Sequence, residues 1–222
     1  MRIVNLIVSI VLLISLPISA ICLANNLAAR MPDLYQYELK ATEALNNLTI
    51  EQNEDELGAF FSEFMMGKTD RFQIEYQFGD NTDNLFTLEE QKTMAQFRKM
   101  MDMALWLGIT TFVLAFLSCL FLYKQNLKQL IRSTFVKAGV LFAVLAAAVL
   151  SSALIDPVME IQYELLFHYE LKPFLVLHQL LPVSFFRHLA EATVGMSFIG
   201  MGGLWYFLWK ITKPRRIFGS LR

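Results

Sequence analysis

Four long apolar runs alternate with polar stretches along the chain of 222 residues. A helix of about 20 mostly apolar residues crosses a hydrocarbon core of roughly 30 Å, so each run is long enough to span a membrane. The runs cover residues 3–28, 104–123, 134–155 and 193–211. This pattern predicts an all-α integral membrane protein with four transmembrane helices, forming a single membrane domain over residues 1–222.

The charged residues divide the polar stretches into two kinds. All 20 acidic residues lie in residues 29–103 and 156–192. Ten of the 19 basic residues lie in segments without any acid, around Arg2 and in 124–137 and 210–222. Basic residues in short loops are retained in the cytoplasm, so both termini are expected there and the two acidic stretches are expected outside. The expected cytoplasmic segments are 124–133 and 212–222.

The first apolar run is expected to be an uncleaved membrane anchor. It exceeds the apolar length of about 7–15 residues that is typical of a secretory signal peptide. Ile21 also stands where a lipidation site ending at Cys22 would need a small residue.

The first external stretch, 29–103, carries the patterns of several short elements. A stripe of large apolar residues runs through 57–66 at helical spacing, and Gly67 marks its end. Two interpretations of the stripe stay open: a helix lying on the bilayer or against the spans, or the core stripe of a small external domain. Helical propensity also marks 34–46, and alternation over 71–78 predicts a strand or extended segment.

A capping box predicts where the second span begins. Thr87 stands at the N-cap position with Glu90 three residues later, directly before a helical run. The helix over 88–103 meets no Pro or Gly before the second apolar run, so one continuous helix is expected to descend into the membrane.

The second external stretch is expected to form interfacial helices. Asp156 and Pro157 are typical of a helix start and predict a helix over 158–171. Two further apolar segments, 174–181 and 184–192, are separated by Pro182 and are too short to cross a bilayer. They are therefore interpreted as interfacial or re-entrant helices.

All three histidines of the chain lie in this second stretch. Glu160, Glu164 and His168 recur every four residues, which places them along one helical face, where a carboxylate can orient the imidazole one turn later. The competing interpretation is a solvated acidic face that carries a surface histidine. For His178 and His188, which lie among apolar residues, a structural or headgroup-facing role is expected.

Several functional classes lack their sequence signals. The ten-residue spacing of the histidines matches no zinc motif, and there is no HExxH, CxxC, nucleotide-binding loop or nucleophile elbow. No span carries an obvious ionisable residue of the kind that marks ion or proton paths, which argues against a pump or channel. We expect no cofactor, no metal and no nucleic-acid partner. Substrates or partners are expected at the outer face of the membrane that the chain spans.

Two segments resemble a known family. Residues 86–98 (FTLEEQKTMAQFR) fit the frame Phe/Tyr-x-Glu-Arg-Glu-Ile/Leu-Ser-His-Met-x-Asp-Val-Lys. After the third run, Asp156 is followed by FHYEL at 167–171 and by LPVSFF at 181–186, which echo an acidic start, Phe-His-Glu-Ile/Leu-Phe-Phe and Phe-Pro-Glu-x-Phe-Trp. The chain thus resembles, over nearly its whole length, the bacterial four-span family that includes the lipoprotein intramolecular transacylase.

The resemblance implies an activity and a set of site residues. Members of the family are thought to use two histidines to move an acyl chain from the diacylglyceryl cysteine of a lipoprotein to its own α-amine. In this chain His168 matches the second histidine, whereas Thr93 and Gln96 stand where the family has the first histidine and an acid. Neither of these two residues can act as a base at neutral pH. Either His178 or His188 supplies the missing function, or the chain binds a related substrate, or it is catalytically silent.

The leading hypothesis is therefore a membrane acyltransferase in the bacterial cytoplasmic membrane, with membrane lipids and diacylglyceryl lipoproteins as partners. The expected site residues are His168 as general base, Glu164 or Glu170 as its orienting acid, and Thr93 or Gln96 as oxyanion donor. The alternative is a non-catalytic membrane protein that binds lipids or a partner through its external region.

Overall fold

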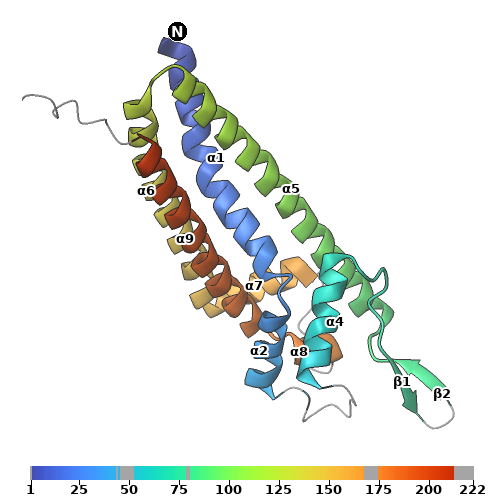
Figure 1. The fold of residues 1–222 in the computed structure, drawn as a ribbon. Coiled ribbons are helices and arrows are strands. Elements are labelled where there is room, and N and C mark those ends of the chain that lie inside the picture. Colours follow the sequence, from blue (N-terminus) through green and yellow to red (C-terminus); the bar gives the residue numbers. More distant parts are fainter. Residues whose placement is uncertain (1, 44, 46–52, 79–80, 168–174, 213–222) are drawn as a thin grey trace, which may run out of the picture.

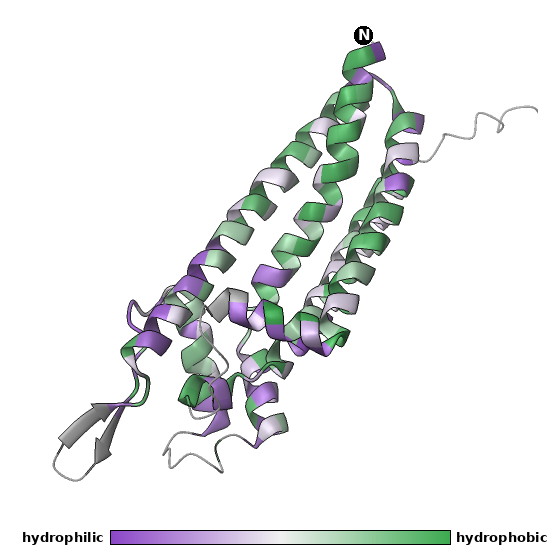
Figure 2. Ribbon diagram, turned by 180° about the vertical axis from the view of Figure 1, so that it is seen from behind, coloured by the Kyte–Doolittle hydropathy of each residue, from purple (hydrophilic) through white to green (hydrophobic). Residues whose placement is uncertain are grey.

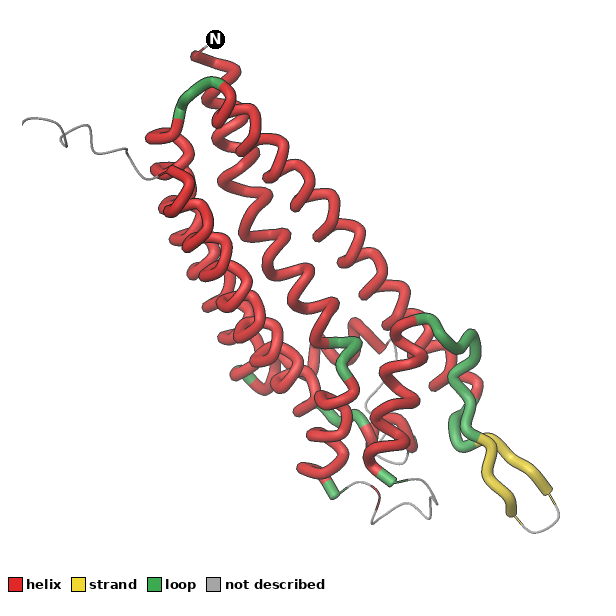
Figure 3. Tube along the Cα trace, viewed as in Figure 1, coloured by secondary structure: helices red, strands yellow, loops and turns green. Residues whose placement is uncertain are grey.

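Four long helices form a bundle, and the shorter elements gather at the end of it opposite the N-terminus (Figure 1). The computed structural model describes residues 2–43, 45, 53–78, 81–167 and 175–212. The tube view separates the bundle from the short helices, loops and hairpin beyond it (Figure 3). We call this end the head region, made of the described parts of residues 29–103 and 156–192. At the opposite end, all charged residues of the bundle helices are basic, and we call it the basic end.

Three of the long helices are long and apolar enough to cross a membrane by length and composition, which makes the chain a multi-pass membrane protein. These are α1 (Arg2–Ala28), α5 (Leu88–Lys124) and α6 (Lys128–Leu154). The fourth long helix, α9 (Ser184–Thr212), packs against α1 and α6 but is not among the three. Its first turns carry Arg187 and Glu191, and its later part is rich in Gly, Trp and Tyr, which lowers its hydropathy.

The helices α5 and α9 both continue without a break, because neither contains a proline. As predicted, the helix that the Thr87 capping box opens runs without interruption into the second span. The prediction of a separate interfacial helix over 184–192 was wrong, because these residues form the first turns of α9. Pro182 ends the preceding helix, and no proline follows it before Pro214, so nothing stops α9 once Ser184 has begun it.

The head region contains four short helices and a hairpin. The helices are α2 (Pro32–Thr42), α4 (Glu54–Met66), α7 (Asp156–Phe167) and α8 (Val176–Leu180). The hairpin pairs β1 (Glu75–Phe78) with β2 (Asn81–Asn84) in antiparallel register. The strand predicted over 71–78 is thus confirmed for its second half.

α4 begins three residues earlier than the apolar stripe indicates. Asn53 forms a capping box with Glu56, in which the Asn53 side chain accepts from the Glu56 amide at 2.8 Å. The helix ends at Gly67, whose φ of 78° lies in the left-handed region that favours glycine. The stripe itself faces inward.

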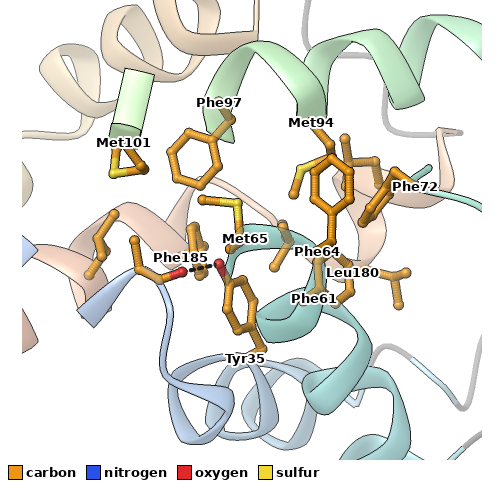
Figure 4. Packing of buried hydrophobic residues seen from close by; sticks show 14 of the residues in the cluster. Tyr35, Phe61, Phe64, Met65, Phe72, Met94, Phe97, Met101, Leu180 and Phe185 are labelled. Atoms are coloured by element: carbon orange, nitrogen blue, oxygen red, sulfur yellow. Dashed lines mark hydrogen bonds between the residues drawn. The ribbon is translucent and has the colours of Figure 1, made fainter. Parts of the chain in front are cut away.

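A cluster of buried aromatic and aliphatic side chains forms the core of the head region (Figure 4). Phe61 and Phe64 of α4 lie in it beside Tyr35 of α2, Phe72, and Phe97 of α5. The α4 stripe therefore packs inside the protein. Because Ala28 of α1 and Met101 of α5 also belong to this cluster, the stripe packs against the long helices of the bundle as well as against the short elements of the head region.

The bundle helices consist mostly of apolar residues along their length (Figure 2). Large side chains such as Trp106, Val140 and Ile199 are exposed there. Monomeric soluble proteins rarely expose an apolar surface of this extent, whereas a lipid-facing surface requires one. Polar colours concentrate in the head region, as the sequence pattern predicts.

Candidate functional site

The first turn of α5 holds a buried carboxylate that fastens α8 to α5. Glu90 Oε2 accepts from the Thr87 amide at 2.8 Å, completing the capping box. Its other oxygen, Oε1, accepts from the Leu177 amide of α8 at 2.7 Å. Glu90 is fully buried, so both oxygens need these donors. The segment that matches the family frame is therefore fixed to α8.

Thr93 and Gln96 lie in different surroundings, although they are three residues apart. Thr93 is buried one turn after Glu90 and directly precedes Met94 of the head core, whereas Gln96 is exposed. A buried hydroxyl can donate one hydrogen bond to an oxyanion but cannot accept a proton as a base at neutral pH. Of the two expected donors, Thr93 thus has the more preorganised position.

His168 and Glu170 lie outside the described residues. Glu164, which is expected to orient His168, is exposed on α7. The elements on either side of residues 168–174 both contact α5, because α7 packs against it and Leu177 of α8 donates to Glu90. The described elements α7 and α8 therefore both contact the helix that carries Thr93.

The second histidine, His178, is held by a buried tyrosine. Its Nδ1 lies 3.0 Å from the hydroxyl of Tyr163, which is fully buried on α7 and donates to the Leu181 carbonyl at 3.3 Å. Because the Tyr163 hydroxyl donates its hydrogen to the Leu181 carbonyl, its oxygen can accept a hydrogen bond from Nδ1–H of His178. Burial lowers the pKa of His178 below its ordinary value of 6.5. These contacts tie α7 to α8, which agrees with the structural role expected for His178.

The third histidine, His188, forms a dyad with Glu38. Glu38 of α2 is fully buried, and its Oε2 accepts a short hydrogen bond from Nδ1 of His188 on α9. Its Oε1 accepts from the Ser184 hydroxyl at 2.7 Å, so both carboxylate oxygens are satisfied. The rings of Tyr37 and His188 pack edge to face, with their centroids 4.9 Å apart and their planes at 89°. We call Glu38 and His188 the Glu38 dyad.

The geometry of the Glu38 dyad is suited to proton transfer. A carboxylate without its proton only accepts, so in that form Glu38 takes a hydrogen bond from Nδ1–H of His188 and leaves Nε2 as the nitrogen that can take up a proton. The side chain of His188 is 22% exposed, so its ring can be reached from outside the protein. A buried acid that fixes the tautomer and direction of an imidazole is the orienting half of a catalytic triad.

The sequence alone gives no sign that Glu38 and His188 are paired, because they are 150 positions apart. One signal was present in the pattern of α2. Tyr35, Glu38 and Leu39 recur at helical spacing, and all three are buried, so an acidic residue stands on the apolar face of the helix. A carboxylate in that position requires a hydrogen-bonding partner from elsewhere in the fold.

No group of three or more metal-ligating side chains occurs among the residues that the structure describes.

Comparison with solved structures identifies the fold. The chain superposes on the membrane integral lipoprotein intramolecular transacylase Lit from Bacillus cereus with a TM-score of 0.72, covering 96% of this chain and 97% of that one at 15% identity. Two Lit variants, in which a histidine is replaced by alanine or by arginine, give TM-scores of 0.68 and 0.65. The chain has the Lit fold. No protein-family model and no curated protein sequence matches it significantly.

The likeness to Lit confirms the family resemblance at the level of the fold. It extends over the head region as well as the bundle, since only a few per cent of either chain is left out. At 15% identity it does not carry residue roles or activity from Lit to this chain.

Proposed function

We propose that this chain is a membrane acyltransferase related to Lit, acting on diacylglyceryl lipoproteins in a bacterial cytoplasmic membrane. It would move an acyl chain from the lipid-modified cysteine to the α-amine of the same substrate. The observation that carries the proposal is the likeness to Lit over 96% of the chain. The resemblance of residues 86–98 and 156–186 to two family segments agrees with it.

In this proposal α9 is the fourth span, and the head region faces outward. Three observations support the span: α9 packs along α1 and α6, exposes Phe198, Ile199 and Phe207, and has no acid after Glu191. Large apolar side chains on the outer face of a bundle helix are suited to lipid contact. Four spans place both termini on the cytoplasmic side together with the basic end.

The proposed reaction needs one base and one oxyanion donor. His168 takes a proton from the α-amine as its nitrogen attacks the ester carbonyl carbon, and a C–N bond forms. The C–O bond of the ester then breaks, and the glyceryl oxygen that leaves takes up a proton. Thr93 donates to the oxyanion of the tetrahedral intermediate, while Glu164 or Glu170 orients the imidazole. Because both reacting groups belong to one substrate, proximity supplies much of the acceleration.

The Glu38 dyad is the second candidate for the base. Thr93 and Gln96 cannot replace the family's first histidine in proton transfer, whereas His188 already has a buried carboxylate on Nδ1 and an accessible ring. The aromatic rings of Tyr35 and Phe185, which are 5.5 Å apart, continue from the helices of the dyad to Phe97 on α5. His188 is therefore connected to the α5 side of the core by packed side chains.

The competing function is a non-catalytic membrane protein that binds lipids or a partner through the head region. The specific observation in its favour is the loss of the family's histidine and acid at Thr93 and Gln96. The exposed position of Gln96 agrees with this reading, because a surface glutamine stabilises no oxyanion in a dry site.

The test is mass spectrometry of lipoprotein N-termini from a bacterial host that lacks N-acyltransferase and expresses this chain. An acylated α-amine is expected with the parent chain. His168→Gln keeps hydrogen bonding but removes the base, so product formation should fall about 10²–10⁴-fold. The matched control is His178→Gln, another histidine of the same stretch, which should retain activity if the protein accumulates normally.

The same experiment distinguishes His168 from His188 as the base, and the enzyme from the binding protein. Loss in His188→Gln but not in His168→Gln would assign proton transfer to the Glu38 dyad. Well-expressed parent protein that leaves the lipoprotein amine free would reject the enzyme and favour the binding protein.

A further inference from the structure

A groove opens between α5 and α9 at the basic end of the bundle. It has a volume of about 400 Å³ and is lined almost entirely by apolar side chains. Leu12 of α1 and Ile131 of α6 form a buried floor, while Phe116 of α5 and Phe207 of α9 are exposed on the two rims. The groove therefore opens toward the side of the bundle that would face lipid.

The groove has the length of one membrane leaflet. Its lining on α5 runs from Phe112 to Tyr123, which is about 16 Å at a rise of 1.5 Å per residue. Half of a hydrocarbon core of roughly 30 Å is about 15 Å. A lipid acyl chain that enters from the same leaflet would therefore fill it from end to end.

Two cationic side chains lie beside residues that line the groove. Arg132 lies over the ring of Trp209, at 3.5 Å from its centroid, and lines a small cavity that shares Ile131, Phe135, Leu208 and Thr212 with the groove. Lys128 lies over the ring of Tyr123, a groove residue, at 5.2 Å. Both positive charges are thus held by aromatic rings that adjoin the apolar lining.

The sequence segments that form this end of the molecule supply no acidic side chain to pair with these cations. Residues 1–32, 103–155 and 192–222 contain no Asp or Glu at all. A cation at a membrane interface without an acidic partner in the protein attracts the phosphate of an anionic lipid. Arginine and lysine are also the side chains that bind phosphate best.

We propose that this groove binds one anionic glycerophospholipid, with an acyl chain between α5 and α9 and the phosphate at Lys128 and Arg132. The apolar lining selects a lipid rather than a soluble phosphate compound, and the two cations select an anionic headgroup. The site lies at the opposite end of the bundle from the head region. It requires membrane insertion but not acyl transfer, so it can stand or fall independently of the proposed reaction.

The test is native mass spectrometry of the purified full-length chain in neutral detergent. The protein is incubated with equal amounts of phosphatidylglycerol and phosphatidylcholine carrying identical acyl chains. The phosphatidylglycerol adduct is expected to dominate and to survive an excess of glycerol phosphate. Each basic residue near the surface contributes about fivefold to anionic-lipid attraction, so Arg132→Gln and Lys128→Gln should each lower that adduct by about this factor.

The matched control is Lys137→Gln, which removes the same charge from an exposed position of α6 outside the groove. It should leave the adduct within twofold of the parent, roughly the scatter of additive effects. Cys119→Trp places a large ring in the groove and should reduce the adducts of both lipids while the cations remain. Equal retention of the two lipids, an equal loss in Lys137→Gln and Arg132→Gln, or full retention in well-folded Cys119→Trp would each overturn the proposal.

Discussion

Hydrogen bonds decide what two of the three histidines can do. His178 and His188 both engage Nδ1, but the partner of His178 is a neutral phenol and that of His188 is a buried carboxylate. Only the second arrangement stabilises a positive ring when a proton arrives at Nε2. The first leaves His178 as a half-buried side chain whose pKa is lowered by burial.

This difference predicts a pH effect on stability. Because the folded protein lowers the pKa of His178, it binds that proton less tightly than the unfolded chain does. The contribution of the neutral ring is therefore complete above about pH 6.5 and is lost as the pH falls from there toward the lowered folded pKa. We expect the melting temperature in detergent to fall less between about pH 7.5 and about pH 5 in His178→Gln than in the parent.

All other titratable groups are present in both proteins, so their effects cancel in the comparison. An identical pH dependence in parent and variant would show that the surroundings of His178 do not favour its neutral form.

At the scale of elements, the contact between α5 and α8 depends on the hydrogen bond that Glu90 accepts from the Leu177 amide. Glu90→Ala removes the acceptor of the buried Leu177 amide and half of the capping box. A buried donor left without a partner costs about 1–3 kcal/mol, so the head region should become more sensitive to protease. Glu90→Gln keeps one acceptor oxygen and should be affected less.

The matched control for this prediction is Glu89→Ala, which changes the neighbouring acid of the same helical turn. Glu89 is exposed, so its loss should cost a few tenths of a kcal/mol through the helix dipole alone. Equal protease sensitivity in Glu89→Ala and Glu90→Ala would mean that the contact with α8 contributes nothing.

The same residues show how far the sequence predicts this fold. Local signals found the start of α5 from Thr87 and Glu90 and the start of α7 from Asp156, because a cap needs only neighbouring residues. The junction at 184–192 was misjudged, since apolar length alone cannot tell a short interfacial helix from the first turns of a long one. The Glu38 dyad could not be paired from sequence because it depends on how α2 docks against α9.

At the scale of the whole molecule, the separation of charges makes a prediction about topology. Single cysteines at Glu63, Gln129 and Lys210 test it, in a background without Cys22 and Cys119; all three positions are exposed. A membrane-impermeant maleimide should label Glu63→Cys in intact cells. Gln129→Cys and Lys210→Cys should react only after permeabilisation, because basic segments stay in the cytoplasm.

Lys210 is the position that tests the number of spans. It lies at the end of α9, so its labelling in intact cells together with protection of Gln129 would mean that α9 does not cross. Labelling of Gln129 from outside would reverse the orientation of the whole bundle.

The length of α5 also sets a height above the membrane. Its 37 residues extend for about 55 Å, whereas a hydrocarbon core takes up roughly 30 Å. From Ala104, where the apolar run begins, to Thr93 is about 16 Å along the helix axis, which is more than the few ångströms of headgroup layer on each side. An ester that meets Thr93 would therefore have to rise about three helical turns out of the hydrocarbon core alongside α5 before any bond is exchanged.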